Sequence, residues 1–173
     1  MTRYVAFLRA INVGGKNIIL MKDLTSLFSS LGFTDVRTFL QTGNVCFTSG
    51  LKEQTLVEKI EVGIEKKFRL SVKVFVVSFS TLQKMIQENP FQNILDSADT
   101  KKYVTFFSGT ILTLPSFSPN KDVEILSRQK GIVFSLSHTV KGKSGFPNAF
   151  IEKQGKVFST TRDWKTVQKL LLI

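Results

Sequence analysis

Apolar residues recur in the first half of the chain with the two periods typical of helices and strands. Two stretches follow the 3.6-residue period of an amphipathic helix. In the first, Gly32 follows the last apolar position, where it is typical of a helix C-terminus. The apolar positions of the two helices are Leu20, Leu24, Leu27, Phe28 and Leu31, and then Leu56, Ile60, Ile64 and Phe68.

Strand-like segments flank these helices. "RYVAFLRAI" and "SVKVFVVS" are rich in residues that favour strands, and "DVRTFLQTGNVCFTS" reads as a hairpin with its turn at Thr42-Gly43-Asn44. The order in residues 1–78 is therefore β-α-β-β-α-β, which is the split-βαβ or ferredoxin-like plan.

The second half of the chain predicts a similar order. Residues 79–100 form a connecting helix, "STLQKMIQENPF", and a polar joint. In residues 101–173, "KYVTFFSG" is a strand, the two prolines of "LPSFSPN" permit only a short helical turn, and "VEILSRQKGIVFSLS" is a hairpin. "GFPNAFIEK" begins a helix near Pro147, "KVFSTT" is a last strand, and "RDWKTVQKLLLI" is a closing helix. The predicted fold class is α+β, with two ferredoxin-like halves and mainly antiparallel sheets.

Composition limits the class of protein. With 173 residues, 42% of them hydrophobic, the chain is long enough to bury a globular core. Its single cysteine, Cys46, excludes an internal disulfide framework and is expected to be a small buried hydrophobe. Arg9 interrupts the first apolar run, and no stretch approaches the roughly 18 apolar residues of a membrane span. We therefore expect a cytoplasmic protein without a membrane partner.

The net charge of +11 is concentrated at the two ends of the sequence. Residues 1–78 carry +5, residues 79–129 are neutral, and residues 130–173 carry +6. Such a field favours anionic partners without naming one.

Three strings make a resemblance to a known family specific. They are "YVAFLRAINVGGKN", "LGFTDVRTFLQTGNVCF" and "TTRDWKTVQKLL". Together they resemble the bacterial family named domain of unknown function 1697, most clearly over residues 3–48 and 142–171. The resemblance implies two ferredoxin-like halves and supplies no function. The sequence departs from the family at Ala10, Thr42 and Asp163, where relatives usually have Gly, Ser and Asn.

The glycine-rich loop after the first strand is the most specific candidate for chemistry. "AINVGGKNI" lacks the first Gly of a Walker A motif, and Asn17 replaces its hydroxyl residue. Adjacent Gly14 and Gly15 also fail the dinucleotide fingerprint. Two interpretations stay open: an anion-binding nest supported by Lys16, or a turn that needs positive φ, which is favoured.

Two other basic loops suggest anion binding. "VKGKSGF" precedes a predicted helix, whose N-terminus would attract an anion, although Ser144 as a simple helix cap is the favoured alternative. In "STTRDWK", Arg162 and Lys165 fall in the first turn of the predicted helix, where the helix dipole disfavours cations; a bound anion or an ion pair with Asp163 would remove this conflict. Thr160 and Asp163 match a capping box, and Trp164 is expected in the core.

The sequence-based hypothesis is that these loops converge on one small anionic or phosphorylated ligand between the halves. The candidate ligand-binding residues are Arg9, Asn12, Gly14, Gly15, Lys16, Gln41, Asn44, Lys143 and Arg162.

Other functions have weaker support. His138 is the only histidine, so a His-rich metal site is excluded, and no Gly-x-Ser-x-Gly motif is present. No cofactor is expected, and the sequence leans against an enzyme. An enzyme that uses His138 or Asn44 on a phosphorylated substrate stays as an alternative. Sequence-tolerant nucleic-acid binding through the basic ends is the other, although Tyr4 and Phe7 fall on opposite strand faces and form no stacking platform. The sequence leaves the oligomeric state open.

Overall fold

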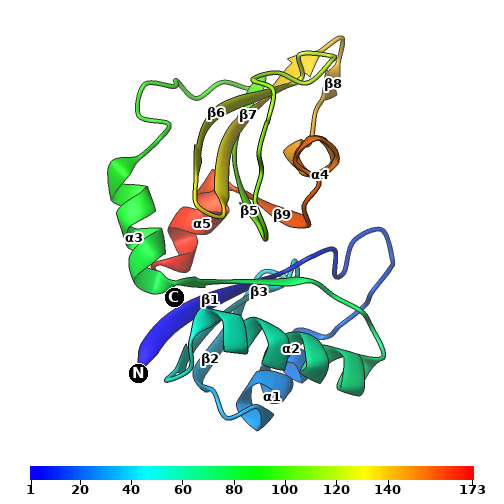
Figure 1. Cartoon of the computed structure of the whole chain (residues 1–173), viewed down its shortest axis with the longest axis vertical. Coiled ribbons are helices and arrows are strands. Elements are labelled where there is room, and N and C mark those ends of the chain that lie inside the picture. Colours follow the sequence, from blue (N-terminus) through cyan, green and yellow to red (C-terminus); the bar gives the residue numbers. More distant parts are fainter. The chain divides into compact units, whose positions relative to one another are not determined.

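The computed structural model describes all residues from Met1 to Ile173. They form two compact units (Figure 1). Unit 1 comprises Met1–Lys84 and the last four residues, Leu170–Ile173, and unit 2 comprises Met85–Lys169. The chain thus divides between Lys84 and Met85, and the sequence-based segments 1–78, 79–100 and 101–173 stay a proposal.

Unit 1 follows the predicted order. Its elements are β1 (Thr2–Leu8), α1 (Met21–Ser30), β2 (Thr34–Phe39), β3 (Asn44–Ser49), α2 (Glu53–Phe68) and β4 (Val74–Ser78). The strands form one antiparallel sheet in the order β2-β3-β1-β4. Gly32, at φ +84°, follows the last turn of α1 as predicted.

The core of unit 1 lies between the sheet and its two helices, which cover one face of it (Figure 1). The predicted stripe residues Leu24, Leu27 and Phe28 of α1 are buried there, together with Leu56, Ile60 and Ile64 of α2. Aromatic rings fill the centre, with Phe47 of β3 in contact with Phe28 and Phe33. Cys46 is also fully buried, as expected, and burial raises the pKa of its thiol.

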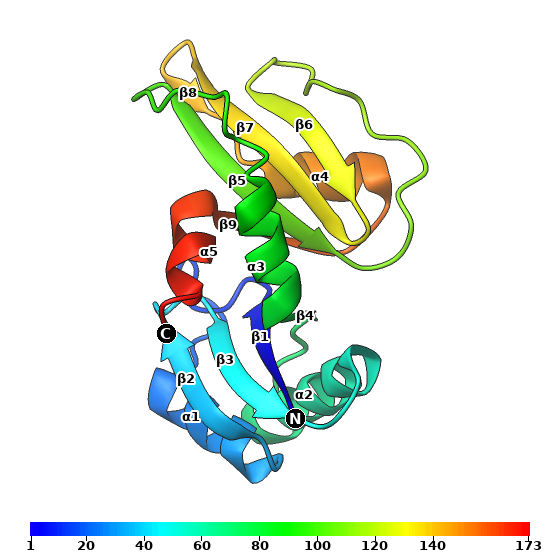
Figure 2. The same cartoon turned by 90° about the vertical axis from the view of Figure 1, so that its left-hand side faces the viewer.

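Unit 2 repeats the strand order of unit 1. After α3 (Phe79–Glu88), the chain forms β5 (Thr100–Phe107), β6 (Val123–Gln129), β7 (Ile132–Val140), β8 (Lys143–Ser144), α4 (Pro147–Gly155), β9 (Ser159–Asp163) and α5 (Trp164–Leu170). The sheet order is β6-β7-β5-β9, with β8 paired to β7 (Figure 2). The predicted α+β class with two antiparallel sheets is therefore confirmed.

One predicted element of unit 2 is wrong. The segment "LPSFSPN" forms no helical turn, and no helix separates β5 from β6. Instead the chain folds back along β6, where the Ile125 N–H donates to the Ser116 carbonyl at 2.7 Å and Phe117 forms an isolated antiparallel β-bridge with Glu124. Pro115 and Pro119 remove two backbone donors that a helix would need, whereas in the extended conformation the Ser118 N–H donates to the Val123 carbonyl at 2.9 Å.

The two faces of the unit 2 sheet differ in polarity. On one face, Phe134 contacts Phe91, whose ring packs 5.1 Å from that of Trp164. The opposite face lies under α4, where Ile151 joins Phe107 and Val133 in a small apolar cluster. Buried hydroxyls stand beside that cluster. Thr105 and Thr161 share a hydrogen bond of 2.8 Å, and Asn148 Oδ1 accepts from Thr161 and Ser159.

Ser135 gives a stability prediction because its buried hydroxyl has no hydrogen-bond partner. We expect Ser135→Ala to stabilise the protein by about 1 kcal/mol, since it removes an unsatisfied polar group. The melting temperature would then rise by about 2–4 °C. Thr105→Val is the matched control. It removes a satisfied hydroxyl on the same face, so it should lower the melting temperature in differential scanning calorimetry. A Ser135→Ala protein that melts below the wild type would contradict the prediction.

Candidate functional site

The glycine-rich loop forms a tight reversal of the chain. Gly14 and Gly15 adopt φ of +58° and +72°, and the Lys16 N–H donates to the Val13 carbonyl at 3.1 Å. Two consecutive positive φ values are the requirement of a type I′ turn. The favoured interpretation of the two glycines, a turn that needs positive φ, is confirmed. Lys16 is exposed, and anion binding at this loop stays a prediction.

The Asn12 side chain holds this loop in place through hydrogen bonds to Ile19 and Gln41. Its Nδ2 donates to the Ile19 carbonyl at 2.9 Å and to the Gln41 carbonyl at 2.8 Å, while its Oδ1 accepts from the Ile19 N–H at 2.8 Å. Both ends of the Asn12 amide are therefore used within unit 1. Asn17 adds a hydrogen bond from Nδ2 to the Ala10 carbonyl at 3.1 Å.

The other candidates of unit 1 lie near the ends of its strands. Asn44 is fully buried at the start of β3, and its Nδ2 donates to the Phe39 carbonyl at 2.9 Å and to Thr42 Oγ1 at 3.1 Å. The side chain therefore closes the β2–β3 turn. Arg9 is half-buried, and its backbone N–H donates to the Lys73 carbonyl at 2.9 Å. Gln41 is exposed.

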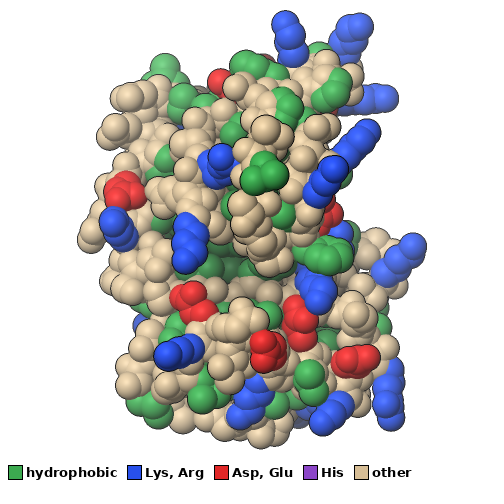
Figure 3. All heavy atoms as spheres, in the orientation of Figure 1, with side chains coloured by type: hydrophobic (Ala, Val, Ile, Leu, Met, Phe, Trp, Pro, Cys, Tyr) green, Lys and Arg blue, Asp and Glu red, His purple; other side chains and the backbone are tan.

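Lys143 lies on the short strand β8, which hydrogen-bonds to the end of β7. Figure 3 shows basic side chains that project from this part of unit 2, and both Lys141 and Lys143 are exposed. The expectation that Ser144 caps the next helix is wrong. Helix α4 begins at Pro147 with Phe146 as its N-cap, and Ser144 Oγ contacts Thr139 Oγ1 at 3.0 Å instead.

Arg162 lies in a strand, so the predicted capping box is wrong. Thr160 belongs to β9, and Asp163 alone caps α5 by accepting the Lys165 N–H at 2.9 Å. The Arg162 side chain is buried, and its Nη1 donates to Thr160 Oγ1 at 2.7 Å and to the Thr161 carbonyl at 2.9 Å. Desolvation lowers its pKa to about 10. Trp164 is buried in the core as predicted.

Unit 2 also contains a pocket of about 540 Å³ that the sequence did not reveal. Its lining comes from the segment between α3 and β5, from the first residues of β5, and from Asp163 and the first turns of α5. Phe91, Ile94, Leu95 and Trp164 give it an apolar part. None of the nine predicted site residues lines it. The polar composition of "QNILDSADTKK" predicts only a joint between the halves, yet this segment provides much of the lining.

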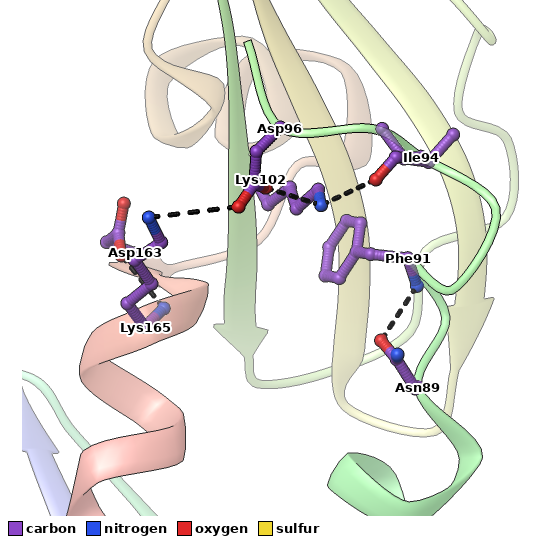
Figure 4. Close-up of polar contacts among 7 residues, drawn as sticks. All are labelled: Asn89, Phe91, Ile94, Asp96, Lys102, Asp163 and Lys165. Carbon is purple, nitrogen blue, oxygen red and sulfur yellow. Dashed lines mark hydrogen bonds and ion pairs between the residues drawn. The ribbon is translucent and has the colours of Figure 1, made fainter.

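The charged side chains of this pocket form a small network (Figure 4). Lys102 Nζ donates to Asp96 Oδ1 at 2.7 Å and to the Ile94 carbonyl at 2.7 Å. Lys165 Nζ lies 4.0 Å from the other oxygen of Asp96. The Asp96 carboxylate is largely exposed, and its hydrogen bond to Lys102 lowers its pKa below the usual range. Two ammonium groups thus flank one anionic group at the pocket wall.

No cluster of three or more His, Cys, Asp and Glu side chains provides the ligands of a metal ion. No helix of the chain is both long and apolar enough to span a membrane.

The sequence matches one known protein family over most of its length. The family model described as "Protein of unknown function (DUF1697)" matches residues 1–124. The chain belongs to the DUF1697 family. This confirms the resemblance carried by "YVAFLRAINVGGKN", whereas the similar end of the chain, residues 142–171, lies beyond the matched range. No function is established for the family, so membership supplies no activity for this DUF1697 protein.

A solved structure resembles the whole DUF1697 chain. It is the conserved bacterial protein SP0830 from Streptococcus pneumoniae, with a TM-score of 0.71 and 23% sequence identity. The alignment covers 99% of this chain and 97% of the other. At this identity the similarity supports the fold alone. The search of curated proteins finds no match.

Proposed function

We propose that unit 2 binds a small molecule with an anionic group in the pocket between residues 89–102 and α5. The observation that carries this proposal is the position of the Asp96 carboxylate, 2.7 Å from Lys102 Nζ and 4.0 Å from Lys165 Nζ. A carboxylate or phosphate of a ligand that displaced Asp96 would meet the same two ammonium groups. Asp96 lies on an irregular segment outside any helix or strand, so its displacement disturbs no regular element.

The apolar part of the pocket favours an organic ligand over a free inorganic anion. Phe91 and Trp164 are almost fully buried, and both line the pocket, as do the apolar side chains of Ile94 and Leu95. Small-molecule sites of this size combine apolar walls with a few polar groups that fix the orientation of the ligand. The pocket therefore suits a molecule with a flat or apolar body and one anionic end.

A direct test compares inorganic phosphate with phenyl phosphate, which adds an apolar ring to the same anion. The single Trp164 lies in the pocket wall, so binding should change its fluorescence. We expect phenyl phosphate to bind more tightly than phosphate. Asp96→Asn should tighten both a few-fold, because the neutral amide no longer competes for the two ammonium groups. Lys102→Met should weaken both by at least about tenfold, since it removes a charge-assisted contact.

Lys130→Met is the matched control, because it removes one exposed positive charge from unit 2 outside the pocket. It should leave the affinity for phenyl phosphate unchanged at moderate salt. If Lys130→Met and Lys102→Met weaken binding equally, the net charge of the protein is responsible and the proposal fails. Weaker binding by Asp96→Asn would also contradict it.

The remaining sequence-based hypotheses keep the status of proposals. One is that the basic loops 12–17, 141–145 and 160–165 bind an anion; the first lies in unit 1 and the other two in unit 2. The nucleic-acid alternative has no stacking surface at β1, where Tyr4 is nearly buried and Phe7 is completely buried.

A further inference from the structure

Three polar side chains on adjacent strands of unit 2 form a continuous hydrogen-bonded series. His138 Nδ1 lies 3.4 Å from Thr100 Oγ1, and His138 Nε2 lies 2.8 Å from Glu124 Oε2. Thr100 of β5 stands directly opposite His138 of β7 in the strand register. Glu124 of β6 is paired with Leu136, two residues before His138, so all three side chains lie on one face of the sheet.

The sheet fixes this arrangement more firmly than a loop would. Each of the three residues belongs to a strand, β7 lies between β5 and β6, and Glu124 is paired with Leu136 before the register of β6 shifts after Ile125. Groups held on strands keep their mutual geometry better than groups on loops. Their side chains are partly buried, with 30% of His138 and 29% of Glu124 exposed, so water still reaches them.

The hydrogen bond to Glu124 determines which nitrogen of His138 can act as a base. A carboxylate oxygen accepts a hydrogen bond from an N–H group, so neutral His138 carries its hydrogen on Nε2. Nδ1 then has a free lone pair directed to the Thr100 hydroxyl. The three groups therefore follow the order carboxylate, imidazole, hydroxyl. In this order the carboxylate orients the imidazole, and the imidazole acts as a base that activates the hydroxyl as nucleophile.

Thr100 connects this series to the pocket. Thr100 lines the pocket, whereas His138 and Glu124 do not. Thr100 therefore belongs both to the pocket lining and to the hydrogen-bonded series, and His138 contacts its hydroxyl from outside the lining. Lys102, the cation of the proposed anion site, lies two residues further along β5 on the same face as Thr100. A bound molecule would then have its anionic end and a reactive hydroxyl within one site.

We propose that the pocket catalyses acyl transfer, with Thr100 as nucleophile, His138 as general base and acid, and Glu124 as a positioning residue for the imidazole. The substrate class is a carboxylic ester with an anionic group. This inference rests on the proposed function to the extent that the substrate occupies the same pocket.

The reaction proceeds in two halves. Thr100 Oγ forms a bond to the acyl carbon while its proton passes to His138 Nδ1. The tetrahedral intermediate collapses, the bond from the acyl carbon to the leaving oxygen breaks, and Nδ1 returns the proton to the departing alcohol. A water molecule then attacks the acyl-Thr100 ester with the same help from His138. This step releases the carboxylic acid and restores the Thr100 hydroxyl.

The test uses two activated esters on the full chain, 4-nitrophenyl acetate and 4-nitrophenyl hydrogen succinate, which adds a carboxylate. We expect a burst of nitrophenolate with both esters, faster turnover of the succinate, and an acyl group on Thr100 in peptide mass spectrometry. Thr100→Ala should lower the rate at least about 100-fold, and Thr100→Ser should keep the burst. A fluorophosphonate ester should label Thr100 as well, which tests the nucleophile without requiring the correct acyl group.

Variants of the other two residues separate catalysis from structure. His138→Ala should lower kcat about 100-fold. Glu124→Gln should lower kcat with little change in KM, because the amide still fills the space but no longer holds the imidazole in the required tautomer. Thr139→Ala is the control: Thr139 neighbours His138 in β7 and points to the opposite face, and its loss should leave the rate unchanged.

The results that overturn this inference differ from those that overturn the binding proposal. Acylation confined to lysines, at equal rates in wild type and Thr100→Ala, with no fluorophosphonate label on Thr100, overturns the catalytic assignment. Phenyl phosphate binding measured on Thr100→Ala tests the pocket independently, because the substitution leaves both ammonium groups in place. Binding without Thr100-dependent acylation therefore refutes the activity alone.

Discussion

Replacement of Gly43 by alanine should destabilise unit 1 by about 3 kcal/mol, from backbone strain and steric overlap together. Gly43 has φ +79°, a conformation that side chains disfavour. A Cβ at this position would also lie 2.9 Å from Leu8 Cβ and 2.9 Å from two side-chain carbons of Ile11. Leu8 Cβ is attached directly to the backbone of β1, and the Leu8 N–H donates to the Gly43 carbonyl at 2.8 Å. A rotamer change therefore cannot relieve the overlap.

Gly14→Ala is the matched control for this substitution. Gly14 also has positive φ, +58°, but no atom lies within 4 Å of the position that its Cβ would take. Its substitution should therefore cost only the strain, about 1 kcal/mol. Urea denaturation followed by circular dichroism measures both. Equal losses for the two variants would show that the close approach of Gly43 to β1 contributes nothing.

Trp164→Ala should destabilise unit 2 by about 4 kcal/mol, the ordinary cost of emptying a buried aromatic position. Trp164 is 5% exposed, and its ring lies 5.1 Å from that of Phe91. Loss of the indole removes the part of α5 that packs against this side of the unit. Because Trp164 also lines the pocket, the variant should bind phenyl phosphate poorly even at temperatures where it stays folded.

Trp164→Phe separates packing from the special properties of indole. It keeps an aromatic ring against Phe91 and should cost about 1.5 kcal/mol or less. Hydrogen exchange of the unit 2 amides measures the loss of stability directly. It does not depend on tryptophan fluorescence, which both variants abolish. Protection that falls equally in Trp164→Phe and Trp164→Ala would contradict a role based on filled volume.

Most of the fold is visible in the sequence because its signals are local. The stripe of Leu24, Leu27 and Phe28 predicts α1, and the turn residues around Gly43 predict the β2–β3 hairpin. The error near the C-terminus has a local cause too. Thr160 and Asp163 have the spacing of a capping box, but β-branched threonines also favour strands, and pairing with β5 decides in favour of β9.

The candidate site was less predictable because it depends on register. His138 directly follows the predicted hairpin "VEILSRQKGIVFSLS", yet its partners Thr100 and Glu124 lie 38 and 14 residues away in sequence. Only the pairing of β7 with β5 and β6 brings the three together. The pocket was missed for a related reason. Residues 89–99 are irregular, and no pattern in them indicates which side chains they bring near Lys165.

The return of the chain to its first unit has a consequence for biosynthesis. Residues 170–173 belong to unit 1, and Arg37 Nη1 donates to the Ile173 carbonyl at 3.3 Å. A ribosome that makes the chain from its N-terminus synthesises all of unit 2 before these residues emerge. Unit 1 can form its sheet and core early, but it gains residues 170–173 only after all of unit 2 has been synthesised.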